Sequence, residues 1–174
     1  AIVLTGSDEA SCRESLELTR AHPGFLYCTA GIHPHHASDF SAAATLPFLR
    51  SLCEQPQVLA VGECGLDFNR DFSPRDQQAS CFAAQLELAA DHRLPLFMHE
   101  RDAHDAFIGA MREQRDAVVG GVVHCFTGTL EQATAYLDLD LHIGITGWLC
   151  DERRGQHLQE VVRHVPADRL MLET

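Results

Sequence analysis

Short β-type runs alternate along this chain with segments in which apolar residues recur every three or four positions, the spacing of an amphipathic helix. The β-type runs cover residues 1–5, 25–32, 58–64, 95–99, 118–125, 142–145 and 169–173. The helix-type segments cover residues 11–20, 42–52, 76–92, 103–114, 130–137 and 156–163. This alternation predicts parallel strands joined by crossover helices, which is an α/β fold.

Two α/β architectures fit the alternation: a doubly wound sheet and a (β/α)8 barrel of the TIM type. A dinucleotide-binding sheet carries a glycine-rich turn after its first strand, and the residues Thr5-Gly6-Ser7-Asp8 do not form one. Polar residues instead gather after several strands, where barrels place their active sites. A full barrel has eight strands and typically ~250 residues. We therefore expect one barrel domain over residues 1–174, an incomplete one of about seven strands, with the first strand and the last helix missing.

Composition excludes several functions. The net charge of −12 argues against binding nucleic acid by bulk charge. All 13 basic residues are arginine, which excludes Schiff-base chemistry and a Walker-type phosphate loop within these residues. Seven cysteines without a Cys-x-x-Cys pair indicate a reducing cytoplasm rather than a disulfide framework. No secretory signal is visible, and no apolar run approaches the ~18 residues of a membrane span. The chain does not begin with Met and opens in an apolar run, so we expect its amino end to be cut.

Three separate strands end in residues that bind metals: Glu63, His99 and His124. Packing accounts for each one alone, as a buried Glu–Arg pair or a hydrogen-bonded core histidine. Their recurrence at the carboxyl ends of three strands favours a metal site. Mixed histidine and carboxylate ligation suits Zn, Mn or Co better than Mg.

Further polar residues follow the same strand ends. His33 follows the second β-type run and is expected to face the same mouth. The alternative for this segment is a turn fixed by Pro34 with His35 and His36 solvated, and we favour it only for His36. Arg101 shares a strand face with His99 and suits bidentate recognition of phosphate, with a salt bridge to Glu63 or Asp102 as the alternative.

The segment 144–155 follows the sixth run, where barrels often bind phosphate. Arg153 and Arg154 are expected in the first turn of the next helix, where positive charge opposes the helix dipole; this favours a role in binding a phosphodiester backbone. Trp148 is suited to stacking on a base. The alternative is two solvated arginines and a core tryptophan.

Several motifs resemble the TatD family of metal-dependent deoxyribonucleases, over essentially the whole chain and in the family's order. They are Gly31-Ile-His-Pro-His35, Glu63-Cys-Gly-Leu-Asp-Phe-Asn69, His99-Glu-Arg-Asp-Ala-His104, His124-Cys-Phe-Thr-Gly128 and Ile145-Thr-Gly-Trp-Leu-Cys-Asp-Glu-Arg-Arg-Gly155. The resemblance implies an amidohydrolase-like barrel and a 3′→5′ exonuclease on single-stranded DNA; some members also act on RNA. It also implies that Glu63, His99 and His124 bind one or two divalent ions (Mg, Mn or Zn) and that His33 lines the substrate site.

The chain departs from the family at three places. It lacks the His-x-His that many relatives carry on a first strand, and it ends at Glu173-Thr174 where the family motif is Glu-Thr-Asp. The family's His-Cys-Arg is His99-Glu100-Arg101 here, and strand parity predicts that Glu100 points away from the site.

The function expected from these residues is hydrolysis of phosphodiester bonds by metal-activated water. Glu63, His33 and Arg101 are the expected catalytic residues, and His33, Arg101, Trp148, Arg153 and Arg154 the expected substrate contacts. We expect a cytoplasmic monomer that acts on single-stranded DNA, with RNA as a second substrate and DNA repair as the process. Two alternatives remain: a metallohydrolase of small esters or amides, and a homologue without catalytic activity.

Overall fold

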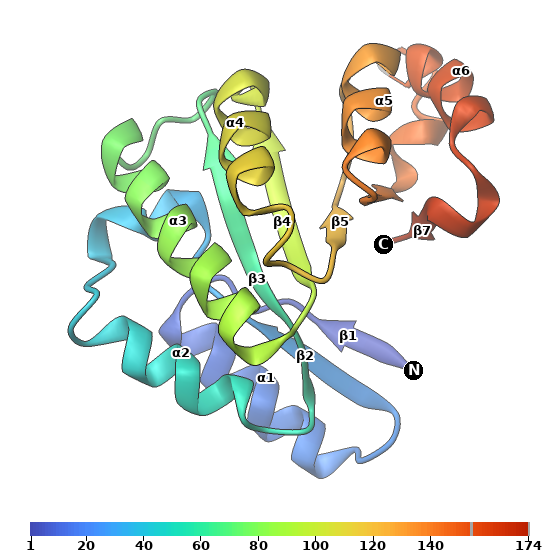
Figure 1. The fold of residues 1–174 in the computed structure, drawn as a ribbon. Coiled ribbons are helices and arrows are strands. Elements are labelled where there is room, and N and C mark those ends of the chain that lie inside the picture. Colours follow the sequence, from blue (N-terminus) through green and yellow to red (C-terminus); the bar gives the residue numbers. More distant parts are fainter. Residues whose placement is uncertain (154, 174) are drawn as a thin grey trace.

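The computed structural model describes residues 1–153 and 155–173, and within them it is built from six βα repeats followed by a seventh strand (Figure 1). The strands are β1 (Ile2–Leu4), β2 (Leu26–Ala30), β3 (Val58–Asp67), β4 (Leu96–Arg101), β5 (Gly121–Val123), β6 (His142–Ile145) and β7 (Leu170–Leu172). The helices are α1 (Glu9–Ala21), α2 (Thr45–Cys53), α3 (Arg75–His92), α4 (His104–Gln114), α5 (Leu130–Asp138) and α6 (Gln156–His164), with short 3-10 turns η1 (Pro34–Asp39), η2 (Gly147–Cys150) and η3 (Ala167–Arg169).

All seven strands are parallel and lie in chain order from β1 to β7 in one sheet. The sheet curls, the helices lie on its outside, and both ends of the chain lie at its open side (Figure 1). An incomplete TIM-type barrel of seven strands is therefore confirmed. Within the described residues, no helix is both long and apolar enough to cross a bilayer.

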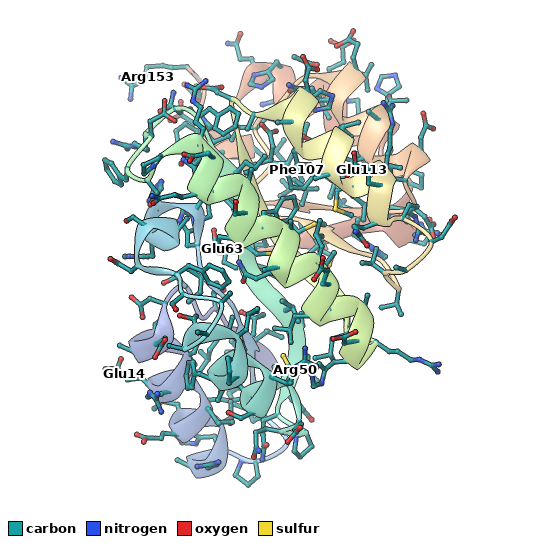
Figure 2. All side chains as sticks on the ribbon, turned by 60° about the vertical axis from the view of Figure 1, so that its left-hand side comes forward. Glu14, Arg50, Glu63, Phe107, Glu113 and Arg153 are labelled. Carbon is teal, nitrogen blue, oxygen red and sulfur yellow. The ribbon has the colours of Figure 1, made fainter. Side chains whose placement is uncertain are left out.

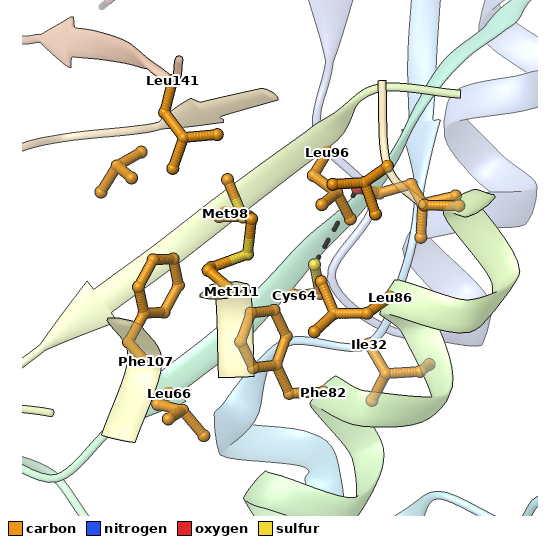
Figure 3. Close-up of a cluster of buried hydrophobic side chains, with 14 of the residues drawn as sticks. Ile32, Cys64, Leu66, Phe82, Leu86, Leu96, Met98, Phe107, Met111 and Leu141 are labelled. Carbon is orange, nitrogen blue, oxygen red and sulfur yellow. Dashed lines mark hydrogen bonds between the residues drawn. The ribbon is translucent and has the colours of Figure 1, made fainter. Parts of the chain in front are cut away.

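The apolar core lies between the sheet and its outer helices. Figure 3 shows Phe82 and Leu86 of α3 and Phe107 of α4 turned toward β3 and β4. The rings of Phe82 and Phe107 stack with centroids 5.3 Å apart, and both side chains are fully buried. This packing fixes α3 and α4 against β3 and β4, the two strands that carry Glu63 and His99.

Two buried glutamines of α3 clamp the chain at the ends of neighbouring strands. Gln78 accepts a hydrogen bond from the backbone N–H of Asp67 (2.9 Å) and donates one to its carbonyl (3.1 Å). Gln85 makes the same pair of bonds with Ile32 (2.8 and 3.0 Å). Because both amides are fully satisfied in the core, they hold the segments that carry Asp67 and His33 in fixed positions.

Strand β3 is longer than the predicted run, since it continues from residue 64 to Asp67. The register between β3 and β4 slips between Val61 and Cys64, a bulge that lies beside Glu63. At Gly65, with φ of +136°, a side chain would overlap the carbonyl oxygen of His99. Glycine here lets the ends of β3 and β4 approach closely, which brings their polar side chains together.

Candidate metal centre

Three imidazoles converge on one oxygen atom of Glu63. Glu63 Oε1 lies 2.6 Å from His124 Nε2, 3.2 Å from His33 Nε2 and 3.3 Å from His99 Nδ1. Glu63 lies in the middle of β3, beside its bulge, His99 lies in the second half of β4, and His33 and His124 lie just after β2 and β5, so the predicted residues gather at one place although Glu63 is not at the end of its strand. Glu63 lies near the middle of the molecule, whereas Glu14, Glu113 and Arg153 lie at its periphery (Figure 2).

The site is buried, and its ionisable groups have pKa values that depart from their ordinary values. Burial disfavours the charged form of Glu63, but hydrogen bonds from His124, His33 and His99 outweigh it and hold the pKa of this carboxyl far below its usual range. Burial likewise opposes the charged form of His124, yet Glu173 and Glu63 raise the pKa of His124 to about 9. The pKa of His33 is lowered because burial exceeds the effect of Glu63.

Two further carboxylates contact histidine nitrogens that face away from Glu63. Asp67 Oδ2 lies 3.2 Å from His99 Nε2 and 2.7 Å from His35 Nε2. Glu173 Oε2 lies 3.1 Å from His124 Nδ1. Asp67 is buried; burial raises its pKa, but the backbone N–H of Arg70 and the side chain of His35 lower it more, and the net pKa is below its ordinary value.

The structure does not support the alternative of a solvated His35, because its ring contacts Asp67. Pro34 starts the turn η1, which turns the His35 ring back over the end of β3 and onto Asp67. His36 is half-exposed and 4.0 Å from Asp8, as expected of a surface histidine. Sequence reasoning gave no role to His35, Asp67 or Glu173; the one sign was Asp67 itself, an acidic residue sharing strand parity with Glu63.

Arg101 lies beside the centre on a polar cavity of about 380 Å³. Its guanidinium donates to Thr127 Oγ1 (3.3 Å) and is exposed, and no salt bridge to Glu63 or Asp102 is present among the described residues. Trp148 of η2 is half-buried against the core and lines the same cavity, together with His157 of α6. The cavity thus lies where the chain leaves β4, β5 and β6.

Glu100 points away from the Glu63 centre, as parity predicts, but it is fully engaged. It accepts hydrogen bonds from the backbone N–H of Ala103 and from the buried hydroxyl of Tyr136, both at 2.7 Å. The Tyr136 hydroxyl lies 2.9 Å from His104 Nδ1. This carboxylate therefore fixes the start of α4 against α5 and forms one wall of the polar cavity.

The predicted position of Arg153 is wrong. Helix α6 begins at Gln156, so Arg153 lies in the preceding loop, where Asp151 accepts its backbone N–H (2.9 Å). The argument from the helix dipole therefore does not apply. Arg153 is exposed and is not among the described residues that line the polar cavity, and Arg154 lies outside the described residues.

A second cavity, apolar and about 390 Å³, lies at the opposite ends of the strands. Leu59, Phe97 and Val122 line it, together with residues that begin β4 and β6. Phe97 lies between this cavity and the polar groups, because its ring stacks on His124 with centroids 4.6 Å apart.

The donor set fits a divalent metal ion. Ligand atoms of His33, Glu63 and His99 lie within 4.8 Å of one another, and His124 contacts the same carboxylate. A buried carboxylate among imidazole nitrogens that are hydrogen-bonded from behind has the chemistry of a transition-metal site. The described residues thus contain a group able to bind a metal.

A family model described as "TatD related DNase" matches residues 1–174. The chain belongs to the TatD family. Its relatives include proteins named 3′-5′ ssDNA/RNA exonuclease TatD from Pantoea sp. (strain At-9b), 51% identical over 173 residues, and from Erwinia tasmaniensis, 50% identical. In both cases the match covers 99% of this chain and 66% of the relative. The chain therefore spans just under two thirds of the length of these TatD relatives.

Solved structures of TatD proteins share the fold. The TatD homologue YJJV from Escherichia coli matches with a TM-score of 0.88 and 30% identity, over 99% of this chain and 66% of that one. A TatD family hydrolase from Entamoeba histolytica matches with a TM-score of 0.87 and 29% identity, over 99% of this chain and 59% of that one.

Proposed function

We propose that this chain carries the metal centre of a nuclease that hydrolyses phosphodiester bonds in single-stranded DNA from the 3′ end, with RNA as a second substrate. The observation that carries the proposal is the convergence of two strand-end histidines, His99 and His124, on the buried carboxylate Glu63. The names of the TatD relatives support the substrate and the direction of digestion. Residues 1–174 belong, in this proposal, to one metallo-hydrolase barrel domain.

Glu63, His99 and His124 are the proposed metal ligands. A divalent ion held there supplies an activated water and neutralises charge on the phosphate. The mixture of one carboxylate and two imidazoles favours Zn or Mn over Mg. Phe97 stacks on His124 with ring centroids 4.6 Å apart and restricts the rotation of this imidazole.

Arg101 and Trp148 are the proposed contacts for the substrate. The exposed guanidinium of Arg101 lies at the edge of the polar cavity, where it suits a phosphate oxygen. Trp148 lies on the wall of the same cavity and offers a face for stacking of a terminal base. Arg153 is the proposed contact for the following phosphate. The acidic chain, at net charge −12, suits an enzyme that engages a strand end locally.

The proposal is tested with the protein at its natural full length. A 5′-labelled single-stranded oligonucleotide is incubated with Mn²⁺ or Mg²⁺ and the wild type, His124→Ala or His164→Ala. His164 is an exposed residue at the end of α6 and serves as the matched control. We expect a ladder that shortens from the 3′ end with the wild type and the control, and none with His124→Ala.

Two results would contradict the proposal. Cleavage by His124→Ala at the wild-type rate would show that His124 is not a metal ligand that the reaction needs. An intact oligonucleotide with a metal-loaded wild type would exclude the nuclease, and hydrolysis of a lactone or phosphotriester by the same preparation would identify a small-molecule hydrolase instead.

A further inference from the structure

The groups behind the three imidazoles differ in kind, although all three rings face Glu63. Each imidazole directs one nitrogen at Glu63 Oε1, at distances of 2.6 to 3.3 Å. A neutral imidazole carries one proton, so the partner of the far nitrogen decides whether the near nitrogen bears a proton or a lone pair. A metal ligand needs the lone pair. The group that contacts the far nitrogen, the one that faces away from Glu63, therefore distinguishes a metal ligand from a hydrogen-bond donor. The distances to Glu63 do not make this distinction.

The far nitrogens of His99 and His124 each contact a carboxylate. The far nitrogen of His99, Nε2, faces Asp67 Oδ2 at 3.2 Å, and the far nitrogen of His124, Nδ1, faces Glu173 Oε2 at 3.1 Å. An ionised carboxylate only accepts hydrogen bonds, so the far nitrogen must carry the proton. When a bound metal ion displaces the proton shared with Glu63, His99 Nδ1 and His124 Nε2 would offer the lone pair to that ion.

The far nitrogen of His33 contacts a hydrogen-bond donor instead. Its far nitrogen, Nδ1, accepts a hydrogen bond from the backbone N–H of His35 at 3.1 Å. A backbone amide nitrogen offers no acceptor, so His33 Nδ1 holds the lone pair and Nε2 carries the proton. The His33 atom that faces Glu63 is therefore a donor.

Both carboxylates are held by the backbone. Asp67 Oδ1 accepts the N–H groups of Asn69 (3.0 Å) and Arg70 (2.8 Å), so its other oxygen is directed at His99. Glu173 Oε1 accepts the N–H of Cys125 (3.0 Å), which leaves Oε2 for His124. His35 contacts Asp67 Oδ2 through Nε2 at 2.7 Å and holds this oxygen from a second side. Fixed acceptors of this kind are able to hold one tautomer of the ring they contact.

We infer that Asp67 and Glu173 are positioning residues that fix His99 and His124 as metal ligands, and that His33 is a hydrogen-bond donor to Glu63 rather than a ligand. This rests on the proposed metal centre. It adds two residues, Asp67 and Glu173, that act through the ligand rings. It also separates His33 from the two histidines that share its contact with Glu63.

The first test reads the tautomers directly. The full-length protein, labelled with ¹⁵N in histidine and loaded with Zn²⁺, is examined by long-range ¹H–¹⁵N correlation, with signals assigned through single-histidine variants. We expect Zn²⁺ on Nδ1 of His99 and on Nε2 of His124, and a protonated Nε2 on His33. A His33 Nε2 bound to Zn²⁺ would overturn the inference.

The second test measures Zn²⁺ affinity by competition titration for Asp67→Asn, His33→Gln and the control Asp71→Asn. Asp71 lies in the loop that follows Asp67 and is an exposed carboxylate paired with Arg75, so the control makes the same chemical change away from the rings. We expect Asp67→Asn to weaken Zn²⁺ binding about 10- to 100-fold. We expect His33→Gln, whose amide still donates, and Asp71→Asn to stay within about threefold of the wild type.

The outcomes separate this inference from the metal centre itself. If His99→Ala and His124→Ala bind Zn²⁺ as the wild type does, the proposed centre fails. If those two variants lose Zn²⁺ and His33→Gln loses it equally, the centre stands and the role of His33 is wrong. If Asp67→Asn keeps wild-type affinity and the wild-type tautomer of His99, the role of Asp67 is wrong.

Discussion

Replacing Gly144 with alanine removes the support of His124 without replacing any proposed ligand. Gly144 lies in β6, and a methyl group there would overlap Oε1 of Glu173 and come within 3.0 Å of the Cα of His124. Glu173 Oε1 accepts the N–H of Cys125, and Oε2 faces His124 Nδ1. The methyl group therefore displaces the Glu173 carboxylate from both partners.

The expected magnitude follows from what must move. The overlapping atom is the end of a flexible side chain, and alanine is about 0.5–1 kcal/mol more favourable than glycine in a strand, so the fold should change in stability by no more than about 1 kcal/mol. Loss of a carboxylate behind a metal-binding histidine typically costs 10- to 100-fold in affinity. That corresponds to about 1.4–2.8 kcal/mol of binding free energy.

The assay pairs Zn²⁺ competition titration with thermal unfolding of the metal-free protein. Gly109→Ala is the control, because Gly109 is exposed in α4 with no atom within 4 Å of an added methyl group. We expect Gly109→Ala to keep wild-type Zn²⁺ affinity and to gain up to about 1 kcal/mol. A folded Gly144→Ala protein that binds Zn²⁺ as tightly as the wild type would refute the reasoning about Glu173.

Three further predictions concern stability. Phe107→Ala, which empties a fully buried ring site, should cost about 3–5 kcal/mol in urea unfolding, and a loss below about 1 kcal/mol would contradict the core described. Tyr136→Phe should cost about 1–3 kcal/mol by the same measurement, since Glu100 loses its buried donor; an unchanged midpoint would oppose this. Asp8→Ala removes the N-cap of α1 and should cost about 1 kcal/mol at pH 7. The backbone N–H of Ser11 lowers the folded pKa of Asp8, so its contribution is present above about pH 4 and is lost as pH falls through that lowered value; the cost should shrink in melts at pH 3, and an undiminished cost would contradict it.

The strands and the strand-end residues were predictable because they depend on local pattern. Apolar runs of period two, separated by amphipathic segments, specify a parallel α/β sheet whose carboxyl ends share one edge. Glu63, His99 and His124 each end such a run, and the structure brings them together. Glu100 was also assigned to the correct face by strand parity, although its bond to Tyr136 depends on how α5 packs.

The residues that surround the proposed ligands were not predictable, because their positions depend on how the loops cross the strand ends. His35 reaches Asp67 only because η1 turns back over β3, and Glu173 reaches His124 only because Gly144 leaves room for it. The predicted helix-type segment 156–163 matches the start of α6, but Arg153 was assigned to the first turn although it lies three residues before Gln156, in the loop after η2.

Anomalous diffraction from crystals of the full-length protein grown with Zn²⁺ tests the central claim most directly. The account predicts a single-ion peak about 2.0–2.2 Å from Glu63 Oε1, His99 Nδ1 and His124 Nε2, with His33 Nε2 outside ligand distance. A peak coordinated by His33, or a metal bound away from Glu63, would contradict the account.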